Sequence, residues 1–577
     1  MLSILLSFFV FIAFLALTTS TGYSVLNLTI NWKNSYHLFF RVGSAYFLGI
    51  AFLVAIFRSF TYFVASPHQS IWITSLLALG LCLCSYKDLY KLLKEILQTR
   101  LFLIFLTFTF FVAPLLLIFW LPFNSLQDVN PIHSLLGSLN SVKYAWVSNF
   151  INECKFFPIL GQNTAQSILS YVTGGVYENR PFLGLFLWLE SSIFFLSIFF
   201  YGIIRMIVSK SRTAFLLVVL IMFGNSALSF SHILVIDSGS PFGLSGYTDT
   251  LYGVFSVFFL FFLHHYLNKK RGINLAVFFL VVLILITNYL ASPQNIILLS
   301  LLTLFITFYS FIYSKDYRMA IFWGLAILLT SIISIPMGGM LTPEFFQTNL
   351  EYYGLMSPSG NSSGLQVYPG YPYHFGNPNE WALGQLSLLK ELQMYIQQGL
   401  SGYSSSIWVL EQIIFNSVRV LFFPLLGIIA FYFLPKKLSS SAKQEDTELP
   451  DSKNFFVFGL LLFFIGFIIC FPFAMNGYKW QFARFMVPAI AVGMFGFSLF
   501  VLYLVDKYKK IGRYIFICLV FTVLVGPLSS FLFTVLNNGI DIYSVETEKR
   551  KMAIEIFLGK GPELSINQCS IETSSSR

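Results

Sequence analysis

Residues 274–312, NLAVFFLVVLILITNYLASPQNIILLSLLTLFITFYSFI, contain two apolar runs and no charged side chain. The runs centre near residues 282 and 304, and each is long enough to cross roughly 30 Å of hydrocarbon at about 1.5 Å per helical residue. In lipid, every backbone amide must be hydrogen-bonded within its own helix or within a closed barrel, and barrel strands would be short and alternating. This stretch therefore predicts a pair of membrane-spanning helices.

The same pattern recurs along the chain. Of the 577 residues, 56% are hydrophobic, 19% are aromatic and 10% are charged, which is too little polar surface for a water-soluble globule of this size. The sequence therefore predicts an all-α polytopic membrane protein with about fourteen transmembrane helices. The further runs centre near residues 10, 54, 78, 111, 194, 224, 259, 328, 423, 465, 495 and 523. The run between Gln69 and Tyr86 is the weakest, and the topology after it inverts if this run does not span.

The positions of Lys and Arg predict the orientation, because cytoplasmic loops of membrane proteins carry an excess of these residues. With the N-terminus outside, the short inside loops, such as those with Arg205 and Lys269, hold about twice as many Lys and Arg as the longer outside segments. The net charge of +10 is thus spread between apolar runs and forms no patch for nucleic acid. We expect a multi-pass protein of the bacterial inner membrane with both termini outside, although an endoplasmic reticulum origin stays open.

Four parts follow from this topology. Residues 1–336 form an N-terminal helical module with an outer loop over 122–181, followed by a long outer loop over 337–410, a C-terminal helical module over 411–533 and an outer tail over 534–577. Residues 1–20 lack a basic segment and a clear cleavage site, so we expect a retained first helix rather than a signal peptide. Both long loops are rich in turn-forming residues, and such loops often carry function.

Acidic residues near the outer ends of the runs are candidates for chemistry. Asp128 and His133 follow the fourth run in LPFNSLQDVNPIHSLL (121–136), where a carboxylate can deprotonate a hydroxyl or hold a metal. Asp249 begins the seventh run, and Glu190 is a costly acid inside the fifth. The alternatives are that Asp128 is a turn residue, that Asp249 favours a helix N-terminus, and that Glu190 reaches water.

Basic residues in NGYKWQFARFMVP (476–488) are candidates for binding phosphate. The planar guanidinium of Arg484 suits phosphate, with Lys479 nearby. The same residues also suit an aromatic and basic anchor at the membrane surface. The six cysteines are scattered without metal-ligand spacing, and a disulfide between Cys154 and Cys569 stays open.

Taken together, these residues resemble the GT-C superfamily of polytopic glycosyltransferases, which includes protein mannosyltransferases and bacterial aminoarabinose transferases. The resemblance rests on short patterns in the expected order: Gly22-Tyr23 after the first run, Asp128 with His133 five residues later, Asn163 and Gln166 in FFPILGQNTAQSIL (156–169), Tyr247-Thr248-Asp249, and Arg484-Phe485-Met486-Val487-Pro488. Two departures are the absence of a paired Asp-Glu or Asp-x-Asp in the first outer loop and the absence of a matching pattern in 337–410.

This resemblance implies a glycosyltransferase that moves a sugar from a polyprenyl-phosphate-linked donor to an unidentified acceptor on the non-cytoplasmic face of the bilayer. Asp128 would be the general base or the carboxylate that orients the acceptor, Asp249 would support the same pocket, and Arg484 would hold the lipid-linked phosphate. No cofactor follows from the sequence, and a divalent metal ion is the one candidate. Beside the catalytic candidates Asp128, Asp249 and His133, the candidates for substrate binding are Arg484, Lys479, Glu190, Asn163 and Gln166.

Three other classes of protein stay open. An O-antigen-type polymerase or ligase would need essential residues in 337–410, where His374 and Lys390 lie. A lipid or polysaccharide transporter would favour helices broken at the midplane and inverted repeats, whereas Pro293 and the other prolines lie mainly at helix ends and in loops. A non-catalytic relative that only binds a partner is the last alternative.

Overall fold

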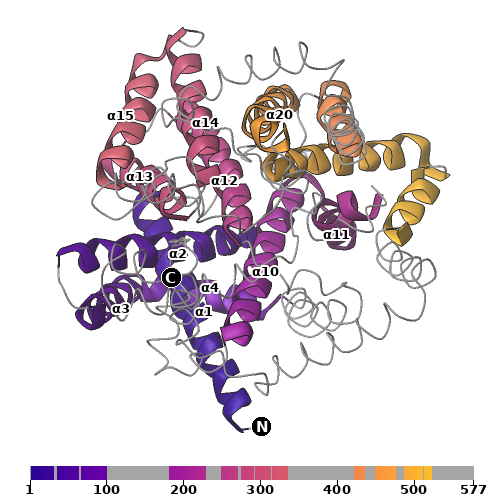
Figure 1. Ribbon diagram of the computed structural model, residues 1–577. Coiled ribbons are helices and arrows are strands. Elements are labelled where there is room, and N and C mark those ends of the chain that lie inside the picture. The colour runs from indigo at the N-terminus through magenta and orange to yellow at the C-terminus, as the bar shows by residue number, and fades with distance from the viewer. Residues whose placement is uncertain are drawn as a thin grey trace, which may run out of the picture.

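The computed structural model describes residues 2–30, 36–63, 67–99, 181–228, 248–270, 274–291, 293–312, 315–334, 421–435, 449–475, 486–510 and 512–522. Throughout these ranges the regular secondary structure is helical and no strand occurs (Figure 1). The first helices are α1 (Leu2–Thr29), α2 (Leu38–Phe63), α3 (Pro67–Cys84), α4 (Tyr86–Leu97), α10 (Pro181–Ile207) and α11 (Ser211–Leu228). The later ones are α12 (Thr248–Lys270), α13 (Leu275–Ala291), α14 (Pro293–Ile312), α15 (Tyr317–Ser334) and α20 (Ser452–Met475), with further helices at Leu421–Phe433, Met486–Lys510 and Gly512–Thr522.

The all-helical prediction is confirmed for the described residues. Most predicted runs coincide with a helix, and the run near residue 523 is described only in its first half, as the helix Gly512–Thr522. The run near residue 111 lies outside the described residues, as do the outer segments 337–410 and 534–577. The weak run near residue 78 is α3. Four helices are long and apolar enough to cross a membrane, namely Phe11–Thr29 in α1, Leu38–Phe57 in α2, Leu251–Lys269 in α12, and Met486–Lys510, and shorter apolar helices accompany them.

Local sequence explains where several helices begin. Proline is the first residue of α3, α10 and α14, where its fixed φ suits the helix and its missing N–H is not needed. The Asn274 side chain accepts a hydrogen bond from the Val277 amide at 2.8 Å and caps α13. Asp316 caps α15 in the same way, through the Met319 amide at 3.1 Å.

Glycines bring α2 into close contact with the helices beside it. A Cβ atom on Gly22 of α1 would overlap the carbonyl oxygen of Ala45, and one on Gly49 would overlap the carbonyl oxygen of Thr18. Gly202 of α10 lies against the α2 backbone in the same way. Small residues at such crossings let helix backbones approach closely, which is how apolar helices associate in lipid. The backbones of α1 and α10 are thereby held directly on α2.

The order of the contacts shows that α1, α10 and α12 each run opposite to α2. On α1, residues 18 and 22 meet residues 49 and 45 of α2. The corresponding ring contacts of α10 and α12 are Tyr46 with Phe195, Phe40 with Phe199, Phe47 with Phe255, and Phe40 with Phe262. As a consequence, α1, α10 and α12 end where α2 begins.

The glycine contacts predict opposite effects for the same substitution at two sites. We expect Gly22→Ala to lower the free energy of unfolding by about 1–3 kcal/mol, because the new methyl group forces α1 and α2 apart. A Cβ on Gly80 of α3 would meet no atom within 4 Å, so Gly80→Ala should be neutral or slightly stabilising through helix propensity. Thermal unfolding of both purified variants in one detergent measures the difference, and equal midpoints would contradict the close approach.

Candidate functional site

Two of the predicted site residues occupy described positions. Glu190 lies in α10, and Asp249 is the second residue of α12. The remaining predicted site residues lie outside the described residues; they are Asp128, His133, Asn163, Gln166, Lys479 and Arg484.

Glu190 and Asp249 lie at about the same height along the axes of the packed helices. Glu190 directly precedes a serine that is hydrogen-bonded to Tyr46 of α2. Asp249 lies within one turn of Tyr252, whose ring centroid is 6.0 Å from that of Phe47, the neighbour of Tyr46. From Asp249 to the end of α12 the helix extends about 30 Å, close to the thickness of a bilayer's hydrocarbon core. Both positions are therefore remote from the ends of α10 and α12 that meet the start of α2.

A buried hydroxyl cluster lies next to Glu190. The Tyr46 hydroxyl is 2.8 Å from Ser191 Oγ and 3.2 Å from Ser192 Oγ. Its ring stacks on Phe195 with centroids 4.1 Å apart. All three hydroxyl-bearing residues are buried. Because an unpaired hydroxyl is costly in an apolar environment, these contacts fix the position of α10 on α2.

A second buried polar cluster joins α12, α13 and α14. The Asn288 side-chain amide donates to Ser256 Oγ and to the Ile284 carbonyl oxygen, each at 2.8 Å. The Asn295 amide donates to Asn288 Oδ1 at 3.1 Å. Ser256 in turn donates to the Tyr252 carbonyl oxygen at 2.8 Å. Asn288 is thus the central residue, and it uses both donor and acceptor groups.

The second cluster lies close to Asp249 along α12. A Cβ on Gly253, one turn after Asp249, would lie 2.7 Å from Asn295 Oδ1, so the amide is packed against the helix backbone there. Thr287 Oγ1 donates to the Ala51 carbonyl oxygen at 3.3 Å and joins α13 to α2. We refer to the six residues of both clusters as the buried polar layer; they are Tyr46, Ser191, Ser192, Ser256, Asn288 and Asn295. The amides and hydroxyls of this layer carry no net charge. Their hydrogen bonds fix the positions of the helices that carry Glu190 and Asp249.

Sequence reasoning did not identify the buried polar layer. A signal was present for Asn288 and Asn295, since NYLASPQN (288–295) interrupts the most apolar stretch of the chain, and polar side chains within membrane segments are rare and specifically paired. Ser191 and Ser192 lie directly after Glu190, which is itself a costly residue in an apolar run. The sequence does not show which polar residues pair with each other, because partners such as Tyr46 and Ser191 are 145 residues apart.

The Asn288–Asn295 hydrogen bond predicts coupling between the two residues. We expect Asn288→Ala and Asn295→Ala each to destabilise the fold by about 1 kcal/mol, and the double variant to fall short of their sum by about 0.6 kcal/mol. Thr522 of the helix Gly512–Thr522 provides the control, because its hydroxyl bonds within its own helix and Asn288→Ala and Thr522→Ala should be additive. Equilibrium unfolding in mixed micelles measures these energies; strict additivity of the asparagine pair would contradict the hydrogen bond.

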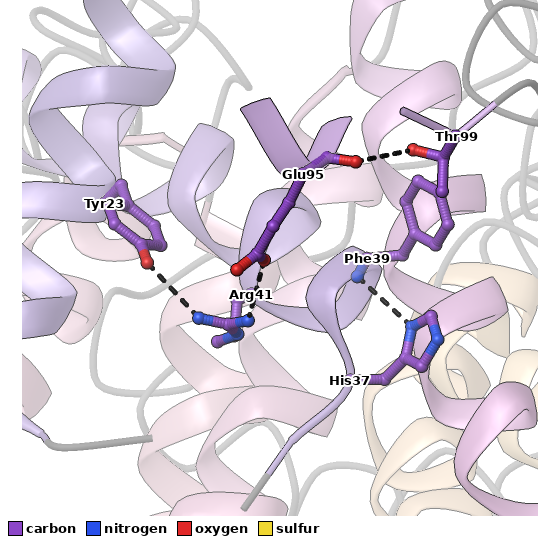
Figure 2. Close-up of polar contacts among 6 residues, drawn as sticks. All are labelled: Tyr23, His37, Phe39, Arg41, Glu95 and Thr99. Carbon is purple, nitrogen blue, oxygen red and sulfur yellow. Dashed lines mark hydrogen bonds and ion pairs between the residues drawn. The ribbon is translucent and has the colours of Figure 1, made fainter. Parts of the chain in front are cut away.

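Charged residues gather instead where α2 begins and α1 and α10 end. Arg41 is 11% exposed; it donates from Nη1 to the Tyr23 hydroxyl at 3.2 Å, and its Nη2 lies 3.6 Å from Glu95 Oε2 of α4 (Figure 2). Arg205 donates to the carbonyl oxygens of Val208 and Ser209 at the end of α10. We call this region the basic end; Lys87, Lys91 and Lys94 of α4 and Lys269 of α12 lie on the elements that meet there.

His37 lies at the basic end, directly before α2. Its Nδ1 accepts a hydrogen bond from the Phe39 amide at 3.3 Å (Figure 2), and its ring meets Tyr201 of α10 with centroids 6.3 Å apart. Burial, followed by the positive charges of Arg205 and Arg41, lowers the pKa of His37 to about 4. The imidazole is therefore neutral at neutral pH, and the two arginines carry the positive charge.

This lowered pKa predicts a loss of stability in acid. In the unfolded chain His37 binds a proton near pH 6.5, whereas in the folded chain it does so only near pH 4. The free energy of unfolding should therefore fall as the pH drops through this window, by an amount on the order of 2–3 kcal/mol. His37→Gln, which has no titrating group, should flatten this part of the profile. Thermal midpoints of both proteins between pH 7 and pH 4 measure the effect, and parallel profiles would refute it.

Metal and disulfide chemistry find no support among the described residues. No group of three or more His, Cys, Asp or Glu within them could hold a metal ion. Cys82, Cys84 and Cys518 are free thiols. Cys154 and Cys569 lie outside the described residues, and so do Asp128 and His133, the positions at which a divalent metal is predicted.

Fold and site together define the class of the protein. Its described residues are all-helical, and several apolar helices indicate a membrane protein, with a buried polar layer beside two acidic positions and a separate basic end. Comparison with protein-family models, with curated proteins and with solved structures finds no match to this chain.

Proposed function

We propose that the chain is a membrane glycosyltransferase of the GT-C type that transfers a sugar from a polyprenyl-phosphate-linked donor to an acceptor. The observation that carries this proposal is the common level of Glu190 and Asp249 beside the buried polar layer. A transferase of this kind needs carboxylates on a rigid support, because positioning of the acceptor hydroxyl supplies much of its rate. The amides and hydroxyls of the layer provide such a support on α2, α10, α12, α13 and α14.

The orientation belongs to the same proposal. The basic end faces the cytoplasm, since positive residues concentrate on that side of membrane proteins. Glu190 and Asp249 then lie toward the non-cytoplasmic face of a bacterial inner membrane, and both termini lie outside. The separation of Arg41, Arg205 and Lys269 from the two acidic positions supports this orientation, whereas Arg58 lies toward the other end of α2.

The roles of the residues follow from the chemistry of the transfer. Asp128 takes the proton of the acceptor hydroxyl as the sugar C1–O bond to the donor phosphate breaks, and the acceptor oxygen forms the new bond. His133 and Asp249 keep this carboxylate oriented. The phosphate leaves with the bonding electron pair, and Arg484 and Lys479 stabilise its charge. Glu190, Asn163 and Gln166 bind sugar or acceptor hydroxyls, and a divalent metal, where present, would be held near Asp128.

Carboxamide substitutions test the proposal. In membranes supplied with a polyprenyl-phosphate-linked sugar, Asp128→Asn should reduce transfer by about 10²–10⁴-fold, as expected for loss of a general base. Asp249→Asn should reduce it by at least tenfold. Asp316→Asn is the matched control: Asp316 caps α15 away from the two acidic positions, and asparagine caps as well as aspartate, so activity should stay within twofold.

Each alternative has its own outcome in the same assay. Wild-type activity in both Asp128→Asn and Asp249→Asn would refute the proposed chemistry. Loss of activity only on substitution of His374 or Lys390 would point to a polymerase or ligase that works through 337–410. Protein content and thermal midpoints of each variant separate loss of chemistry from loss of fold.

A further inference from the structure

The short helix α4 has an apolar face that no described part of the chain covers. Leu92 is buried, and Leu89 and Ile96 pack against the hydrophobic core. On the adjacent face, large apolar side chains are exposed. These are Tyr86 (59%), Tyr90 (69%), Leu93 (54%) and Leu97 (69%). At 3.6 residues per turn these four positions form a single stripe, next to the stripe that meets the core.

Three lysines border this exposed apolar stripe. Lys87, Lys91 and Lys94 are all exposed and lie on one side of the helix, on the flank farthest from the core contacts. Lys87 also lies over the Tyr86 ring, with its Nζ 5.9 Å from the centroid. An apolar stripe flanked by lysines is the arrangement of a helix that lies in a membrane surface, with its lysines at the level of the lipid phosphates.

The position of α4 in the fold also fits contact with a membrane surface. It follows α3 after the single residue Ser85, and α3 exposes its own apolar stripe, formed by Trp72, Leu76, Leu79 and Leu83. The stripe of α3 suits the hydrocarbon core, so α4 begins where this helix reaches the end of the apolar layer. Glu95 pairs with Arg41 (Figure 2). At 3.6 residues per turn, Glu95 lies on the side of α4 away from the exposed stripe, so this pair fixes the rotation of the helix about its axis.

We propose that α4 is a docking surface for anionic phospholipid, in which Tyr86, Tyr90, Leu93 and Leu97 enter the bilayer surface while Lys87, Lys91 and Lys94 bind the headgroup phosphates. A purely apolar partner would leave the lysines unused. Charge complementarity therefore favours anionic over zwitterionic lipid, because each lysine near an anionic surface contributes binding energy. This inference does not depend on glycosyl transfer.

Spin labels test the immersion of α4 in the full chain. The protein, with its six cysteines replaced, is placed in nanodiscs of phosphatidylcholine with phosphatidylglycerol and labelled at Tyr90→Cys or, as a control, at Gln98→Cys. We expect the label at 90 to collide more with oxygen than with a water-soluble nickel chelate, and the label at 98 to show the reverse. A label at 90 that meets mainly nickel would overturn the proposal, and one shielded from both reagents would indicate contact with a second copy and overturn it as well.

Charge removal tests the lipid specificity. The accessibility of the label at 90 to oxygen and nickel is measured as the fraction of phosphatidylglycerol rises. The triple variant Lys87→Gln, Lys91→Gln, Lys94→Gln should need more than about tenfold more anionic lipid to reach half of the full change in accessibility, since each lysine contributes about fivefold to lipid affinity. The matched control is the equally basic and exposed cluster on another helix, changed as Lys507→Gln, Lys509→Gln, Lys510→Gln. The control should stay within about twofold of the parent. Equal shifts in both variants would show a general charge effect and refute a site on α4.

Discussion

Close contact between helix backbones at α2 is the constraint on which the rest of the described structure depends. In lipid, burial of apolar surface does not drive helices together, so their association rests on packing and on interhelical hydrogen bonds. Gly22, Gly49 and Gly202 remove side chains where α1 and α10 cross α2. Only with the backbones at this separation does the Tyr46 hydroxyl reach Ser191, and Arg41 reach Tyr23. The polar contacts of the buried layer and of the basic end are thus consequences of glycine packing.

The two polar regions differ in charge for a physical reason. Side chains deep among the helices, such as Asn288 and Ser256, are neutral and satisfy one another, because an ion in such surroundings would carry a large desolvation cost. Arg41 and Arg205 lie instead at helix ends, where a partner, a backbone carbonyl or water can satisfy them. Along α10 and α12, Glu190 and Asp249 lie on the side of the layer away from Arg41 and Arg205.

Hydropathy predicted the helices well, because the need to satisfy backbone amides in lipid is local and acts on every apolar run alike. It missed α4, since Lys87, Lys91 and Lys94 dilute the apolar residues and the amphipathic period is visible only when positions are projected on a helix. Asn288 and Asn295 are close in sequence, but their pairing depends on how α14 packs on α13. The common level of Glu190 and Asp249 could not be predicted at all, because it follows from how α10 and α12 each cross α2.

The Arg41–Glu95 pair links the membrane-surface helix to the helix that organises the layer. Among the described helices, α4 packs on α1 and α3 and reaches α2 through Glu95. Glu95 is 53% exposed, whereas Arg41 is 11% exposed, so loss of the pair would cost the carboxylate little. Among the described residues it would leave the guanidinium with the Tyr23 hydroxyl. A nearly buried cation without a carboxylate is strongly unfavourable. The position of α4 on the bilayer surface therefore affects the stability of the first turn of α2, and the reverse holds as well.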